Sequence, residues 1–162
     1  LCKMFNNKTS AFYTLGCKLN FSETSTISRQ LKEIGFVKNE FNEGADLFVI
    51  NTCSVTENAN KECRRIIRKA KKTSPNSFVV VTGCFAQLKP QSISEIDGVD
   101  MVLGANDKFN LPTLLVDLNN KNKAPLSWKQ VKGVLTKKHN WLFYGGKKSR
   151  STSNQIWLTF FF

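Results

Sequence analysis

The sequence lacks any long hydrophobic run. None of its apolar stretches approaches the roughly 20 residues that a membrane-spanning helix needs, and residues 1–10 have no apolar core of the kind that a signal peptide carries. We therefore expect a cytoplasmic protein with no membrane contact. With 41% hydrophobic and 22% charged residues, the 162-residue chain has the composition of an ordinary globular protein.

Closely paired cysteines are also missing. The chain has five cysteines, but no two of them form the Cys-x-x-Cys pair that usually marks a zinc site. They do not form the compact run of a ferredoxin either. In a reducing compartment, separated cysteines in odd number indicate metal binding, catalysis or buried packing more often than disulfides.

Acidic residues are absent from the last part of the chain. Residues 1–120 contain all 12 acidic residues against 15 basic ones, a net charge of +3, whereas residues 121–162 contain 9 basic residues and no acidic one. All three tryptophans and the single histidine, His139, lie in that last segment, which shows no helical or strand period. We therefore divide the chain into a flexible lead-in (1–10), one domain (11–120) and an irregular basic tail (121–162).

Two interpretations of the tail stay open. Its basic and aromatic residues could form an arm that binds nucleic acid. The sudden loss of acidic residues and the uncovered apolar end, Leu158-Thr159-Phe160-Phe161-Phe162, favour instead a truncated or frameshifted reading frame. A tail of the second kind is expected to be protease-sensitive, to promote aggregation and to be dispensable for the binding of any metal cluster.

Strand and helix patterns alternate through the domain. Short apolar runs predict strands over 11–15, 46–51, 77–82 and 98–104, and residues 36–41 form either a short edge strand or a covering loop. Apolar periodicity predicts helices that begin near Ser22, near Thr56 or Glu57, at Pro90, and at Asn106 or Asp107. We expect a three-layer α/β domain, with a mainly parallel sheet of about four to five strands and helices on both faces.

Three of the expected strands end in a similar way. They read Phe12-Tyr13-Thr14-Leu15-Gly16-Cys17, Phe48-Val49-Ile50-Asn51-Thr52-Cys53 and Val79-Val80-Val81-Thr82-Gly83-Cys84. The spacings of 36 and 31 residues between these cysteines fit one βαβ unit each. Parallel strands with right-handed crossovers bring all three thiols to the C-terminal edge of the sheet, where open α/β sheets bind their ligands.

Cys17, Cys53 and Cys84 are therefore candidate metal ligands. A single free cysteine is more often a small core residue, but three at equivalent positions favour a metal or iron–sulfur site. Three thiolates leave one iron of a [4Fe–4S] cluster open, and an open position is typical of a reactive centre. Cys63 lies on the apolar face of a helix and is expected in the core, and Cys2 has no expected role.

Other polar residues have two interpretations each. Asn20 and Asn51 either hydrogen-bond around a cluster or satisfy the backbone of turns. The basic helix face that includes Arg64, Arg68 and Lys69 either contacts RNA phosphate, which we favour, or is only solvated. His139 is given no role.

The three cysteine segments together resemble a known family. The resemblance rests on residues 14–24, 50–56 and 81–87. They are similar to the N-terminal domain of the radical S-adenosylmethionine methylthiotransferases, over roughly residues 10–118. In that family the matching cysteines hold an auxiliary [4Fe–4S] cluster, so the resemblance implies this role for Cys17, Cys53 and Cys84.

The Gly-Cys-Lys-x-Asn form at residues 16–20 looks most like the branch that methylthiolates N6-threonylcarbamoyladenosine beside the tRNA anticodon. The resemblance implies a tRNA partner and, in full-length members, S-adenosylmethionine and a second [4Fe–4S] cluster on a barrel domain. No cysteine follows Cys84, so we expect this chain to lack that barrel and to be inactive alone.

A function of another class stays open. The chain could be a non-catalytic α/β module that binds zinc, a nucleotide or phosphate at the same sheet edge. Iron and sulfide content after anaerobic reconstitution separates the two functions.

Overall fold

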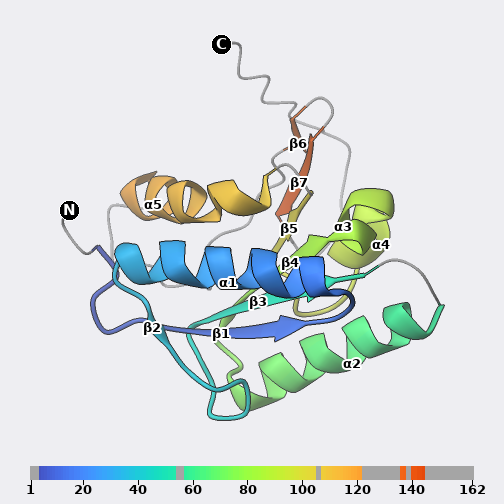
Figure 1. The fold of residues 1–162 in the computed structure, drawn as a ribbon, viewed down its shortest axis with the longest axis horizontal. Coiled ribbons are helices and arrows are strands. Elements are labelled where there is room, and N and C mark those ends of the chain that lie inside the picture. Colours follow the sequence, from blue (N-terminus) through green and yellow to red (C-terminus); the bar gives the residue numbers. More distant parts are fainter. Residues whose placement is uncertain (1–3, 54–56, 105–106, 122–135, 138–139, 145–162) are drawn as a thin grey trace, which may run out of the picture.

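Five parallel strands form the centre of the protein (Figure 1). Across the sheet they are β2 (Val37–Lys38), β1 (Thr9–Thr14), β3 (Leu47–Thr52), β4 (Phe78–Gly83) and β5 (Met101–Leu103). The computed structural model describes residues 4–53, 57–104, 107–121, 136–137 and 140–144. Every residue of β3 and β4 is buried, as their apolar runs predict for strands covered on both faces.

Helices cover both faces of this sheet. One face carries α1 (Lys18–Glu33) and α5 (Leu111–Lys121), which follows the short 3-10 helix η1 (Lys108–Asn110). The other carries α2 (Glu57–Thr73), α3 (Cys84–Leu88) and α4 (Pro90–Ser94). The predicted three-layer α/β fold is therefore confirmed.

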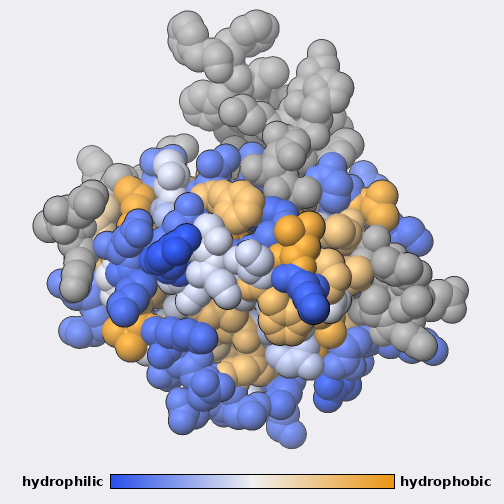
Figure 2. All heavy atoms as spheres, viewed as in Figure 1, coloured by the Kyte–Doolittle hydropathy of each residue, from blue (hydrophilic) through white to orange (hydrophobic). Residues whose placement is uncertain are grey.

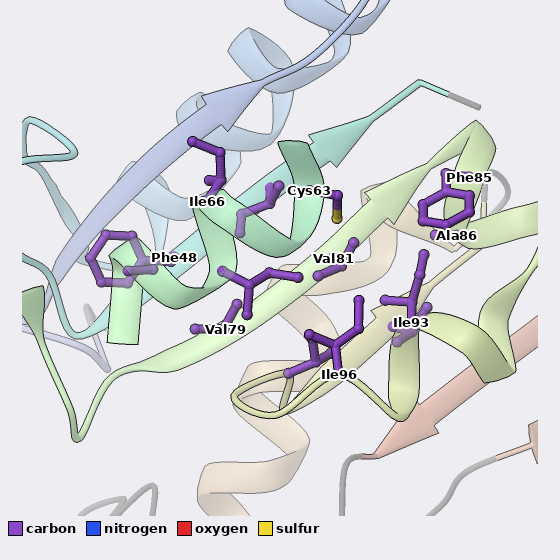
Figure 3. Close-up of a cluster of buried hydrophobic side chains, with 14 of the residues drawn as sticks. Phe48, Cys63, Ile66, Val79, Val81, Phe85, Ala86, Ile93 and Ile96 are labelled. Atoms are coloured by element: carbon purple, nitrogen blue, oxygen red, sulfur yellow. The ribbon is translucent and has the colours of Figure 1, made fainter. Parts of the chain in front are cut away.

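Two apolar cores lie between these layers because successive strand residues point to opposite faces. In β3, Leu47 and Val49 belong to the core under α1 and α5, whereas Phe48 and Ile50 belong to the core under α2. Figure 3 shows the second core, where Cys63 and Ile66 of α2 meet the strands. Cys63 is fully buried, and burial raises the pKa of its thiol to about 12, so the expectation of a core residue is confirmed.

Two helices differ from the expectation at the cysteine edge. Helix α1 begins at Lys18 with Cys17 as its N-cap, so the prediction of an N-cap at Ser22 is wrong. Residues 18–21 belong to the helix because Asn20 is buried on the same face as Thr24 and Ile27, a polar start that apolar periodicity does not reveal. Helix α3 was not expected, because a five-residue helix is too short to show a period.

The sheet continues beyond the five parallel strands. Strand β7 (Asn140–Tyr144) pairs antiparallel with β5, and β6 (Thr136–Lys137) pairs with β7. The irregular tail predicted over 121–162 therefore contains strands, and α5 extends into it as far as Lys121. Its remaining residues, His139 among them, lie outside the described ranges, as does Cys2. Among the helices that the structure describes, none has the length and apolar character needed to cross a membrane.

Candidate metal centre

The three candidate cysteines follow neighbouring strands at one edge of the sheet. Strands β1, β3 and β4 are adjacent, and all three run toward this edge. Thr52 and Gly83 are paired across β3 and β4, and each is followed directly by a cysteine. Because paired strands lie about 4.8 Å apart, Cys53 and Cys84 leave the sheet side by side. The topology thus agrees with the expected common edge.

Solvent reaches all three of these cysteines. Cys17 and Cys84 are exposed and Cys53 is partly exposed, in contrast to buried Cys63. Within the described residues, no three His, Cys, Asp or Glu side chains are grouped so that they could hold a metal ion. The fold therefore brings the cysteines to one edge without joining the thiols, and their role as ligands stays a prediction.

Two glycines let the cysteine segments approach one another. Gly16 has φ +118°, and a Cβ on it would lie 2.6 Å from Cβ and 3.2 Å from Sγ of Cys53. Gly83 has φ +103°, and a Cβ on it would collide with the carbonyl oxygen of Thr52. Any side chain at either position would push these segments apart.

The residues present fit an iron–sulfur group. Cys53 packs directly on Gly16, which precedes Cys17, so two of the candidate ligands lie on touching segments. Accessible thiolates are the ligands that iron–sulfur clusters and zinc prefer. An orphaned acceptor, Asn51 Oδ1, is buried beside the segment of Cys84 and has no hydrogen-bond partner in the described structure.

Two buried asparagines organise this edge. Asn20 Nδ2 donates to the carbonyl oxygen of Leu15 at 2.8 Å, and the thiol of Cys17 donates to Asn20 Oδ1 at 3.7 Å. Asn51 Nδ2 donates to the carbonyl oxygen of Asn20 at 3.1 Å and to Thr24 Oγ1 at 3.2 Å. The backbone-satisfying role that the sequence allowed for both residues is therefore present, and it links α1 to the end of β3.

An ion pair at the same edge escaped the sequence analysis. Lys108 Nζ lies 2.6 Å from Glu23 Oε1, and the two side chains are only 9% and 13% exposed. The two residues are far apart in the sequence and carry no motif. The signal that was available is helical phase, because Glu23 falls between Asn20 and Ile27 on the buried side of α1.

Three large apolar side chains are exposed on the helices that follow Cys17 and Cys84. Leu19 and Phe21 are exposed in the first turn of α1, and Leu88 is exposed at the end of α3. Figure 2 shows hydrophobic surface over the end of α1 that lies at this edge.

The domain is similar in sequence to a family of known proteins. A family model described as "Uncharacterized protein family UPF0004" matches residues 9–104. The threonylcarbamoyladenosine tRNA methylthiotransferases MtaB of Bacillus subtilis and Aquifex aeolicus are 46% and 38% identical over 62% and 65% of the chain. A tRNA-2-methylthio-N(6)-dimethylallyladenosine synthase of Dictyoglomus thermophilum is 35% identical over 70% of it.

The aligned regions are 22%, 26% and 27% of those relatives' own lengths, so the chain spans about a quarter of the proteins that it matches. The family model covers more than half of the chain, including all three strand-end cysteines. The chain belongs to family UPF0004, the N-terminal domain of the tRNA methylthiotransferases.

Proposed function

We propose that this chain is the domain of a tRNA methylthiotransferase that holds an auxiliary [4Fe–4S] cluster through Cys17, Cys53 and Cys84. The observation that carries the proposal is the position of the three thiols, which follow three adjacent strands at one edge. The relatives at 46% and 38% identity are named for threonylcarbamoyladenosine, which supports that adenosine as the substrate. A tRNA substrate also fits the cytoplasmic location that we expect.

Cys17, Cys53 and Cys84 would hold the cluster, which would supply an iron without a cysteine ligand for binding sulfur. The chain's own residues hold the cysteine segments close together. Gly16 and Gly83 allow the three segments to touch, and Asn51 fixes the end of β3 against α1. The N–H groups in the first turn of α1 have no acceptor within the helix, and they favour negative charge at this edge.

Activation of the adenosine carbon belongs to another part of the full-length enzyme. Once Cys17, Cys53 and Cys84 bind one cluster, only Cys2 and Cys63 remain in the sequence. Cys63 is buried in the core and its thiol is protonated at neutral pH, since burial raises its pKa to about 12. We therefore propose that this chain carries sulfur and does not itself generate a radical from S-adenosylmethionine.

Anaerobic reconstitution tests the proposed function. We expect the purified chain, given ferrous iron and sulfide, to bind about four iron and four sulfide ions. With a strong reductant it should leave S-adenosylmethionine intact. Stoichiometric zinc with no bound iron would support the alternative of a zinc-binding module, and cleavage of S-adenosylmethionine would contradict the proposed division of labour.

A basic stripe on α2 suggests where tRNA makes contact. Six exposed basic side chains recur at helical spacing along the side of α2 that faces away from the core: Lys61, Arg64, Arg65, Arg68, Lys69 and Lys72. At 1.5 Å per residue the stripe is about 16 Å long, enough to follow several phosphates. We propose that this α2 stripe binds the tRNA backbone, because its charge is complementary to phosphate.

The variant Arg64→Gln/Arg68→Gln tests the α2 stripe. Neither side chain has an ion pair among those that the structure describes, so we expect the melting temperature to change little. Affinity for a tRNA transcript should fall, and the slope of log K against log salt should decrease by about 2, one for each lost phosphate contact. The matched control is Lys32→Gln/Lys38→Gln, two exposed lysines on α1 and β2. Equal losses in both double variants would refute a specific stripe.

A further inference from the structure

The ion pair of Glu23 and Lys108 is the most buried one in the described structure. The side chains of Lys108 and Glu23 are 9% and 13% exposed, whereas those of Lys71 and Asp100, the next most buried pair, are 24% and 23% exposed. Taking two charges out of water costs free energy that their attraction only partly offsets, so such a pair is weak evidence for a stabilising role. The position of this pair is better explained if it fixes the side chains around it, Asn51 among them.

The pair is connected to the first cysteine through hydrogen bonds. The second carboxylate oxygen of Glu23, Oε2, accepts from Asn51 Nδ2 at 3.5 Å. The same amide donates to the carbonyl oxygen of Asn20, whose side chain accepts from the thiol of Cys17. Lys108 thus pairs with the carboxylate of Glu23, whose Oε2 lies 3.5 Å from the Asn51 amide. That amide donates to the backbone of the Cys17 segment at 3.1 Å.

Asn51 also touches the segments of the other two cysteines. It lies two residues before Cys53 on β3. Its Oδ1 atom lies against Gly83, because a Cβ on that glycine would be only 2.5 Å from it. Gly83 directly precedes Cys84, so one asparagine side chain contacts or adjoins all three cysteine segments.

We propose that Glu23 and Lys108 are positioning residues for the cluster, acting through Asn51. The pair fixes the Asn51 amide and so sets the spacing of the three cysteine segments. Its opposite charges cancel beside the cluster, so that neither changes the cluster's reduction potential. This inference rests on the proposed function.

Reduction potentials of reconstituted variants test the inference. At pH 8, Glu23→Gln leaves an unpaired ammonium near the cluster, and we expect the potential to rise. Lys108→Met leaves an unpaired carboxylate, and we expect the potential to fall, because nearby charge shifts the potentials of such clusters. The double variant removes both charges and should return close to the wild-type potential. Both single variants should bind less iron than the wild-type chain.

The pair of Lys71 and Asp100 provides a matched control. It lies at the opposite edge of the sheet, where Asp100 Oδ2 also accepts from the backbone N–H of Val79. We expect Lys71→Met to lower the melting temperature and to leave the cluster potential unchanged. If Glu23→Gln and Lys108→Met behave in the same way, the pair is only structural and the inference is overturned.

Two further results keep the outcomes distinct. Should a single variant fail to fold, Lys108→Arg tests the positioning role in its place, because arginine keeps the positive charge and alters the geometry of the pair. A changed electron paramagnetic resonance spectrum of the reduced cluster then supports positioning, and an unchanged spectrum contradicts it. A wild-type chain that binds no iron overturns both the proposed function and this inference. A wild-type chain that binds the cluster, with variants whose reduction potentials equal its own, overturns only the inference.

Discussion

Alanine at Cys17, Cys53 or Cys84 removes the cluster from the reconstituted chain, whereas Cys63→Ala leaves it in place. This result is expected because each of the first three thiols opens to solvent at the same sheet edge. The Cys63 thiol is fully buried in the apolar core under α2, with its pKa raised to about 12, so we do not expect it to bind the cluster. Iron and sulfide content, measured after removal of unbound metal, checks the prediction.

Folding controls separate the loss of a ligand from the loss of structure. Cys17 and Cys84 are exposed, so their alanine variants should melt near the wild-type temperature when no metal is bound. Loading with the cluster should raise the melting temperature of the wild-type chain, because the cluster ties three segments together, and should not raise that of the variants. Retention of iron in Cys53→Ala together with its loss from Cys63→Ala would overturn the ligand assignment.

The arrangement of the sheet could be predicted because its signals are local and strong. The apolar run that ends at Val81 is typical of a strand buried on both faces, and β4 is such a strand. The helical spacing of Ile27 and Leu31 predicted the buried side of α1, and both residues are fully buried. Parallel strands end at the same edge of a sheet, so predicting parallel strands was enough to predict that the three cysteines lie at one edge.

The remaining parts of the site depend on contacts that the sequence does not encode locally. Glu23 and Lys108 meet because η1 follows β5 and lies over the start of α1, and no short motif predicts that approach. The first turn of α1 escaped prediction because buried Asn20 gains its partners only in the folded chain. Helix α3 begins at Cys84 because Gly83 adopts a positive φ, a conformation that the residue type permits but does not require.

Gly83→Ala should produce the largest loss of stability of any single substitution at this edge. At φ +103° and ψ −168°, a backbone region that is essentially reserved for glycine, an alanine is strained by about 1–3 kcal/mol. Its Cβ would also collide with the backbone oxygen of Thr52 and lie 2.5 Å from Asn51 Oδ1. Moving the backbone to relieve the collision costs a further ~1–3 kcal/mol. We expect the free energy of unfolding, measured in urea on the metal-free chain, to fall by about 3 kcal/mol or more.

Gly44→Ala supplies the comparison that isolates the collision. Gly44 also has a positive φ, +89°, so its alanine variant is strained as well, but the new Cβ would meet the side-chain oxygen of Ser74 rather than backbone. That oxygen can rotate away, with loss of the hydrogen bond that it accepts from the backbone N–H of Ala45. We expect this variant to lose about 1–2 kcal/mol from the backbone strain and about 1 kcal/mol from the lost hydrogen bond, and to bind iron like the wild-type chain. Gly83→Ala should also lose the cluster, because the collision pushes the end of β4, and with it Cys84, away from Cys53. Equal stability and equal iron content in the two variants would show that the close approach of β3 and β4 does not set the spacing of the cysteines.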